Sequence, residues 1–148
     1  MRTVEQKNTR GMEKKKMVQK LREVQVKLMR GLLDLVILQF LRVHPMHGYQ
    51  VITYIRKNFG VYFGPSTVYP LLGLLEEKGY IKSTWDLNNE RPRKVYSLTR
   101  EGENLLGFTE ASLNQICHKL MTMGLNKLPI GNGISAIPMT TLKTAEIH

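Results

Sequence analysis

The sequence predicts a mainly α-helical protein with one small β-hairpin, and three patterns carry this prediction. Apolar residues recur at helical spacing in several segments between Met12 and Gly79. Two β-rich runs follow, separated by a turn-forming segment. A second long stretch of helical spacing begins after Thr99. Together these patterns predict a winged helix-turn-helix with N-terminal and C-terminal dimerisation helices.

Length and charge narrow the class of protein. A chain of 148 residues is long enough for one modest core. Its net charge of +10 favours an anionic partner, either nucleic acid or an acidic membrane surface. Residues 1–30 hold ten Lys and Arg against three Glu, so most of the excess charge is N-terminal. The longest apolar run, Leu32 to Leu41, is too short to span a bilayer, which needs about 20 residues. No apolar signal core follows the basic N-terminus, so we expect a cytoplasmic protein without a membrane span.

The first 30 residues form a basic tail and an amphipathic helix. Residues 1–11 show no apolar period and predict a mobile tail. Residues 12–29 combine an apolar stripe with many lysines, which predicts a basic amphipathic helix. Its stripe can pack on its own domain or on a partner subunit, and its cations can meet phosphates or a membrane surface.

Residues 31–99 are expected to form the helix-turn-helix domain and its wing. Helices are predicted at about 32–43 and 48–59, with a turn over His44 to Gly48 because proline disfavours helix at the residue before it. A further helix is expected from Pro65 to Gly79. Ser66 is predicted to cap its start and Gly79 to end it. Its inner face comprises Val68, Leu71, Leu72 and Leu75, whereas its other face is small and mostly uncharged.

Residues 81–86 and 93–98 are rich in β-formers and flank a turn-forming segment, so they predict a hairpin. A hairpin directly after a helix-turn-helix is typical of a wing, whose cations contact phosphates. Arg91, Arg93 and Lys94 lie at its tip and return strand. The alternative is a solvated edge, with charges that prevent strand aggregation.

A long apolar stripe follows Thr99, on a helix predicted at 100–123. It offers more apolar surface than one small core can cover, which favours packing against a second subunit. A helix folded back on its own domain is the alternative. Residues 124–148 contain glycines and prolines that break any period, and they predict a flexible tail. The expected dimer contacts are Leu106, Leu113, Ile116 and Leu120.

At this point a family resemblance becomes visible, over about residues 31–106. The chain resembles the PadR-type winged-helix transcriptional regulators. The resemblance rests on motifs in the family's order and spacing, namely Gly31 to Leu38, His47-Gly48-Tyr49, Pro65 to Leu72, Leu75 to Ile81, and Arg93 to Gly102.

The resemblance implies a homodimer with two winged helices on a palindromic operator, and repression as the usual outcome. It also implies that the helix carrying Tyr69 enters the major groove of double-stranded DNA. The expected DNA-binding residues are Ser66, Thr67, Tyr69, Pro70, Gly73, Asn88, Asn89, Arg91, Arg93 and Lys94.

The chain departs from the family in three places. Its N-terminal tail and basic helix are longer than the family usually needs. Gly73-Leu74 stands where family members often carry basic residues, so the helix has no bidentate guanine contact. The C-terminal helix has no tryptophan, which removes support for a planar ligand stacked between subunits. Any small-molecule effector is therefore left unknown.

Two other classes of function compete with DNA binding. An enzyme is disfavoured because the four histidines show no metal-ligand spacing with Cys117 or with paired carboxylates. There is also no glycine-rich phosphate loop and no nucleophile elbow, so we expect no catalytic residue, metal or cofactor. A winged-helix adaptor that binds protein or an acidic membrane surface remains open, because the expected reading helix is poor in cations.

Overall fold

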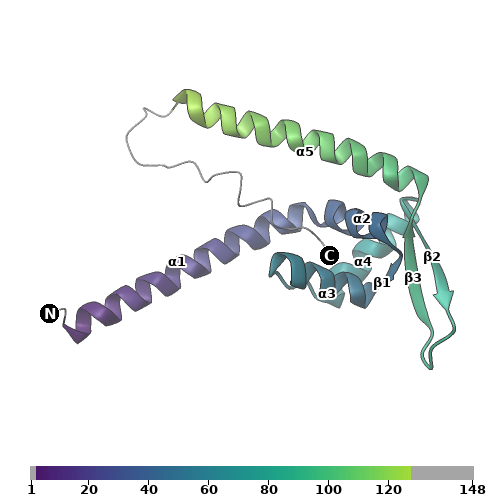
Figure 1. Ribbon diagram of the computed structural model, residues 1–148, viewed down its shortest axis with the longest axis horizontal. Coiled ribbons are helices and arrows are strands. Elements are labelled where there is room, and N and C mark those ends of the chain that lie inside the picture. Colours follow the sequence, from purple (N-terminus) through teal and green to yellow (C-terminus); the bar gives the residue numbers. More distant parts are fainter. Residues whose placement is uncertain (1–2, 128–148) are drawn as a thin grey trace. The chain divides into compact units, whose positions relative to one another are not determined.

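The computed structural model describes residues 3–127, and Figure 1 shows its elements. The chain divides into two compact units, Met1–Ser112 and Leu113–His148. The helices are α1 (Val4–Gly31), α2 (Leu33–Val43), α3 (Gly48–Phe59), α4 (Pro65–Glu77) and α5 (Arg100–Lys127), and the strands are β1 (Met46–His47), β2 (Ile81–Asp86) and β3 (Arg93–Leu98).

The first unit is built on α2, α3 and α4, which lie together beside the sheet (Figure 1). Their apolar faces meet in one core, since α2 alone buries six side chains. That count confirms α2 as the central helix predicted from its near-continuous apolar pattern. The side chains with the least exposure come from every layer of the unit, and they are Ile37, Leu38, Val51, Ile55, Val68, Leu72, Ile81 and Leu106.

The sheet has three antiparallel strands in the order β1-β3-β2, so the predicted hairpin is present and a third strand joins it. Met46 of β1 pairs with Tyr96, and Ser83 of β2 pairs with the same residue from the other side. The prediction of a plain turn over His44 to Gly48 was therefore wrong at Met46 and His47. Two residues are too few to show a strand period, and their partner lies far along the chain.

The ends of α4 differ in how well they were predicted. Gly64 occupies the N-cap position with no side-chain cap, so the Ser66 cap was wrong. Pro65 begins the helix instead, because its fixed φ suits the first turn and it has no N–H to satisfy. Gly79 ends the helix as predicted, with a left-handed φ of 79°. The N–H of Tyr80 then donates to the carbonyl of Leu75 at 3.0 Å and closes the turn.

The N-terminal helix begins at Val4, so the mobile tail predicted at 1–11 was wrong over residues 4–11. Its Glu, Gln, Lys and Arg residues are good helix formers even without an apolar face. Only Met29 of α1 is buried. Gln25 Nε2 donates to the Phe59 carbonyl at 3.0 Å, and the Arg30 guanidinium lies 5.7 Å from the centre of the Phe63 ring. The last turns of α1 therefore contact the rest of the first unit. Five apolar residues of the helix are exposed, and they are Met17, Val18, Leu21, Val24 and Leu28.

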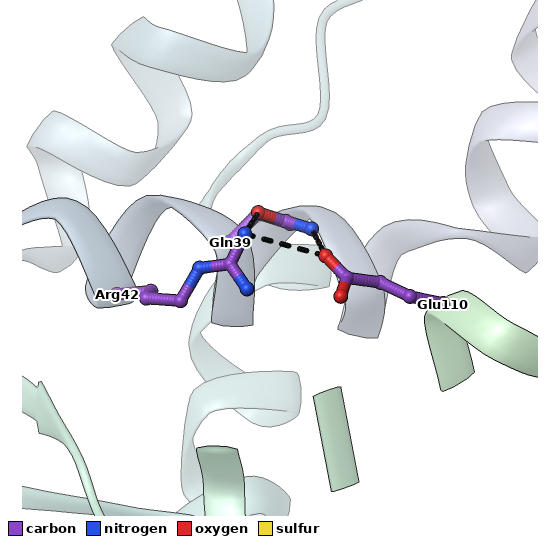
Figure 2. A network of polar contacts seen from close by, with 3 residues as sticks. All are labelled: Gln39, Arg42 and Glu110. Carbon is purple, nitrogen blue, oxygen red and sulfur yellow. Dashed lines mark hydrogen bonds and ion pairs between the residues drawn. The ribbon is translucent and has the colours of Figure 1, made fainter. Parts of the chain in front are cut away.

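Polar contacts cap the start of α5 and join it to the rest of the first unit. Thr99 Oγ1 accepts from the Gly102 N–H at 3.1 Å, which confirms Thr99 as the cap of this helix. Two turns further on, Glu110 meets two side chains of α2 (Figure 2). Gln39 Nε2 donates to Glu110, and Arg42 Nη2 lies 3.3 Å from the same carboxylate oxygen. This part of α5 is thus a structural element of the winged-helix unit.

The second unit contains the remainder of α5, which runs to Lys127 rather than ending at Met123. Its described apolar side chains are mostly exposed, including Ile116, Leu120, Met121 and Met123. The rest of the predicted flexible tail, residues 128–148, lies outside the described part of the chain. None of the described helices is long and apolar enough to cross a membrane.

Candidate nucleic-acid interface

The exposed face of α4 carries the residues expected to meet DNA. Ser66, Tyr69, Pro70 and Gly73 are exposed, and Thr67 is half-buried. Pro70 lies inside the helix and cannot donate to the Ser66 carbonyl one turn earlier. Both residues face solvent, so that carbonyl remains open to water. The face is narrow and uncharged, as the sequence predicted.

Tyr69 is held in place by a close approach to α3. A Cβ atom built on Gly48 would lie 2.5 Å from Tyr69 Cε1, closer than two carbon atoms can approach. Only a glycine therefore lets the ring rest against the first turn of α3. This contact gives a physical reason for Gly48 in the His47-Gly48-Tyr49 motif.

The wing lies next to α4 and is connected to it by an ion pair. Lys94 Nζ donates to Glu76 Oε2 at 3.0 Å, and Ser83 Oγ donates to the other oxygen of Glu76. The hydrogen bonds from Ser83 and Lys94 lower the pKa of the Glu76 carboxyl, and Glu76 raises the pKa of Lys94. The charge of Lys94 is thus already balanced within the domain, unlike those of Arg91 and Arg93.

The tip of the wing is organised by Asp86. Its carboxylate accepts from the Asn88 backbone N–H at 3.0 Å and from Asn89 Nδ2 at 3.2 Å. These bonds form an Asx turn that presets the loop without apolar contacts. The side-chain amide of Asn89 therefore donates within the loop, while Arg91 and Arg93 are exposed beyond the loop.

A groove of about 540 Å³ lies between the start of α3, the side of α4 and the wing. It brings together Tyr69, Arg91, Arg93 and Lys94 of the predicted DNA-binding set. Six predicted residues do not line the groove. They are Ser66, Thr67, Pro70 and Gly73 of α4, and Asn88 and Asn89 at the tip of the wing. The sequence prediction missed the six other lining residues, His47, Gly48, Tyr49, Trp85, Pro92 and Tyr96.

Two of the missed residues had a sequence pattern that could have revealed them. Trp85 is the only tryptophan of the chain and lies on a strand between polar residues, and 62% of it is exposed. Tryptophan is enriched at interfaces because it offers a large apolar ring and a polar N–H, so its exposure on the wing indicates a contact surface. His47 was assigned to the predicted turn over His44 to Gly48, although its place directly before a helix is that of a cap.

The four residues predicted at a dimer interface separate into two groups. Leu106 has 0% exposure within its own chain, so its assignment to a partner contact was wrong. It fills the core of the first unit, because the start of α5 packs there. Leu113 is half-buried, whereas Ile116 and Leu120 are 55% and 63% exposed.

The first unit combines three helices with a two-stranded wing, and cations border the groove beside α4. These features define a winged helix-turn-helix protein. The chain belongs to the PadR-like family of transcriptional regulators. The model of that family matches residues 37–107. Membership makes the chain a DNA-binding transcriptional regulator, a class that does not typically contain enzymes.

Solved structures support this assignment over most of the chain. A PadR family transcriptional regulator from Eggerthella lenta is 30% identical, with a TM-score of 0.65, and the match covers 76% of this chain and 96% of that one. A PadR family transcription regulator from Clostridium difficile is 27% identical, with a TM-score of 0.57 and coverage of 64% and 98%. A PadR-like transcription factor from Bacteroides fragilis is 26% identical, with a TM-score of 0.57 and coverage of 68% and 98%. No curated protein matches the chain.

Proposed function

We propose that this regulator is a homodimeric repressor that binds a palindromic operator in the cytoplasm. The observation that carries the DNA-binding mode is the groove in which Arg91 and Arg93 stand beside Tyr69. Phosphate contacts supply most of the attraction to DNA, and exposed arginines are suited to make them. The narrow face of α4 then fits the major groove, with Ser66, Thr67, Tyr69, Pro70 and Gly73 in contact.

In this proposal the wing residues have different duties. Arg91 and Arg93 bind phosphates directly, and Asn88 with Asn89 shapes the tip that follows the backbone. Lys94 acts mainly through Glu76, as the link that fixes the wing against α4. The effect is a preset angle between the two DNA-contacting elements, which reduces the ordering cost of binding.

Dimerisation is proposed from the exposed apolar residues of α5. Ile116 and Leu120 lie one turn apart on the same helix face and have no cover within the described chain. With Leu113 they form a stripe suited to a second copy, and two symmetric winged helices would require a palindromic operator. The exposed apolar residues of α1 are a second surface for the same purpose.

A gel shift on the duplex upstream of the protein's own gene tests the proposal. We expect that duplex to bind more tightly than a random duplex of equal length at moderate salt. A reporter placed behind it should be less active when the regulator is present. Equal binding to both duplexes would contradict sequence-specific recognition, and a more active reporter would contradict repression.

One observation favours a second candidate function. Residues 65–77 of α4 contain no Lys or Arg, so the helix offers no cation to a base or a phosphate. A winged-helix adaptor that binds a protein would need none there, and one that binds an acidic membrane surface would use the cations of α1 instead. An adaptor would keep its partner when Arg91 and Arg93 are both replaced by alanine, whereas a DNA-binding regulator would lose affinity for every duplex.

A further inference from the structure

His47 takes part in two hydrogen bonds with Gln50, and the one at its ring determines which nitrogen carries the imidazole proton. It is the N-cap of α3, where its Nδ1 accepts from the backbone N–H of Gln50 at 3.3 Å. In return, the Gln50 side-chain oxygen accepts from the backbone N–H of His47 at 3.0 Å. This reciprocal capping box requires a lone pair on Nδ1. The imidazole proton must therefore be on Nε2.

The other ring nitrogen faces a second donor. Arg93 Nη1 lies 3.3 Å from His47 Nε2. A guanidinium only donates, and an Nε2 that carries the proton also only donates. Burial and the charge of Arg93 lower the pKa of His47, which opposes a second proton on the ring. The Nε2–H of His47 and the guanidinium of Arg93 are thus two neighbouring donors, and neither can accept a hydrogen bond from the other.

The surroundings of this pair supply no acceptor of matching charge. Both side chains line the groove between α3, α4 and the wing, and no Asp or Glu is among its lining residues. Arg91 adds another cation there, and the N-terminus of α3 contributes the positive end of the helix dipole. An oxyanion that lies beside the pair, within hydrogen-bond distance of both Nε2 and the guanidinium, would accept from both.

We propose that His47 and Arg93 together bind one phosphate group of the DNA backbone, as a subsite that anchors the start of α3. This inference rests on the proposed DNA-binding function and deepens it. A phosphodiester fits better than a free anion because Tyr49, Tyr69 and Trp85 line the same groove. Their rings can pack against the sugars on either side of the bound phosphate, which a free anion would leave without contact.

The chain offers a variant that separates capping from phosphate binding. In His47→Asn the amide oxygen replaces Nδ1 as the acceptor for Gln50, and asparagine is among the best N-cap residues. The shorter side chain has no atom at the position of Nε2. His47→Asn should therefore unfold at the wild-type temperature and lack only the outward donor. His47→Ala loses both functions and reports the cost of the cap.

The test uses a duplex selected from a random library by the full-length protein. Each backbone phosphate in turn is replaced by an uncharged methylphosphonate, and binding is measured for wild type, His47→Asn and Arg93→Ala. In each half-site, wild type should lose about tenfold in affinity at the phosphate that this subsite binds, the size expected for a charge-assisted hydrogen bond. Both variants should bind the unmodified duplex more weakly and become insensitive to replacement of that same phosphate.

Three results would overturn the subsite. His47→Asn could bind like wild type at every position, or the two variants could map to different phosphates. Inorganic phosphate could also shift the Nε2 resonance of His47 while the methylphosphonate scan stays flat, which would indicate a site for free anions. Failure to select any duplex would contradict the proposed function itself, so the two claims fail in distinguishable ways.

Discussion

Glu76 of α4 accepts a hydrogen bond from Lys94 of β3 at 3.0 Å, and this pair joins the helix expected to read DNA to the wing expected to follow its backbone. The same carboxylate also accepts from Ser83 of β2. One side chain of α4 therefore contacts both strands of the hairpin. The orientation of the wing depends on a residue that never needs to touch DNA.

The pairing predicts a specific pH dependence of stability. The pKa of Glu76 is lowered in the folded chain, first by the Ser83 hydrogen bond and then by that from Lys94. Its stabilising contribution is fully present above the ordinary carboxyl pKa and is lost as pH falls through the lowered folded pKa. Glu76→Gln should therefore unfold at a lower temperature than wild type near neutral pH, and the difference should shrink as pH falls below the ordinary carboxyl pKa. Thermal unfolding at several pH values measures this.

Glu77→Gln is the matched control, because Glu77 is the next residue on α4 and is exposed. It should unfold like wild type over the same pH range. A difference between Glu76→Gln and wild type that stays constant down to acidic pH would contradict the role of the ionised Glu76.

Gly102→Ala should be among the most damaging single substitutions in the first unit. An added Cβ would lie 2.0 Å from the carbonyl oxygen of Tyr80, which is backbone and cannot rotate away. We expect a loss of about 2 kcal/mol or more in the free energy of unfolding, because α5 must shift away from the Gly79 turn. Denaturant unfolding measures it. Gly107→Ala is the control on the same helix, since nothing lies within 4 Å of its added Cβ. Equal stability of the two variants would contradict the close contact.

Gly73→Ala should separate stability from DNA binding. The added Cβ meets no atom within 4 Å and Gly73 lies inside α4, so alanine should stabilise the fold by about 0.5–1 kcal/mol. The same methyl group would protrude from the face expected to enter the major groove. We therefore expect a higher unfolding temperature with weaker binding to the selected duplex. Unchanged affinity in this variant would mean that Gly73 does not lie against the bases.

Ile116→Glu tests the dimer contact on α5. Ile116 is 55% exposed within its own chain, so a carboxylate there should not disturb the monomer, but it would be costly between two apolar surfaces. Light scattering should report the mass of one chain for Ile116→Glu and of two chains for wild type. Gln115→Glu adds the same charge at a neighbouring exposed position and should remain a dimer. A dimeric Ile116→Glu would remove this helix face from the interface.

The sequence predicted those parts of the fold whose causes are local. The cores of α2 and α3 follow from their apolar spacing, and the end of α4 follows from Gly79, which needs a positive φ. The hairpin was predictable because its strands are close in sequence. The family resemblance added the order of these elements and the use of α4.

Contacts between distant residues explain what the sequence could not predict. β1 exists because Met46 pairs with Tyr96, a partner fifty residues away by number. Leu106 shares the apolar period of α5 with Ile116 and Leu120, and only packing distinguishes a core position from an exposed one. In the sequence Lys94 is a cation without a visible partner, because Glu76 lies eighteen positions away and is brought beside it only by the fold. The proton on His47 Nε2 likewise follows from the hydrogen bond that the Gln50 N–H donates to Nδ1.

The claim that exposed wing arginines supply the attraction for DNA is tested most directly by the salt dependence of binding. Affinity for the selected duplex is measured against salt concentration for wild type, for Arg91→Ala with Arg93→Ala, and for Arg56→Ala with Lys57→Ala, which removes the same charge at the far end of α3. The wing variant should bind more weakly and lower the slope of log affinity against log salt by about two for each bound subunit, while the α3 variant keeps the wild-type slope. Equal slopes for the wing variant and wild type would contradict the account.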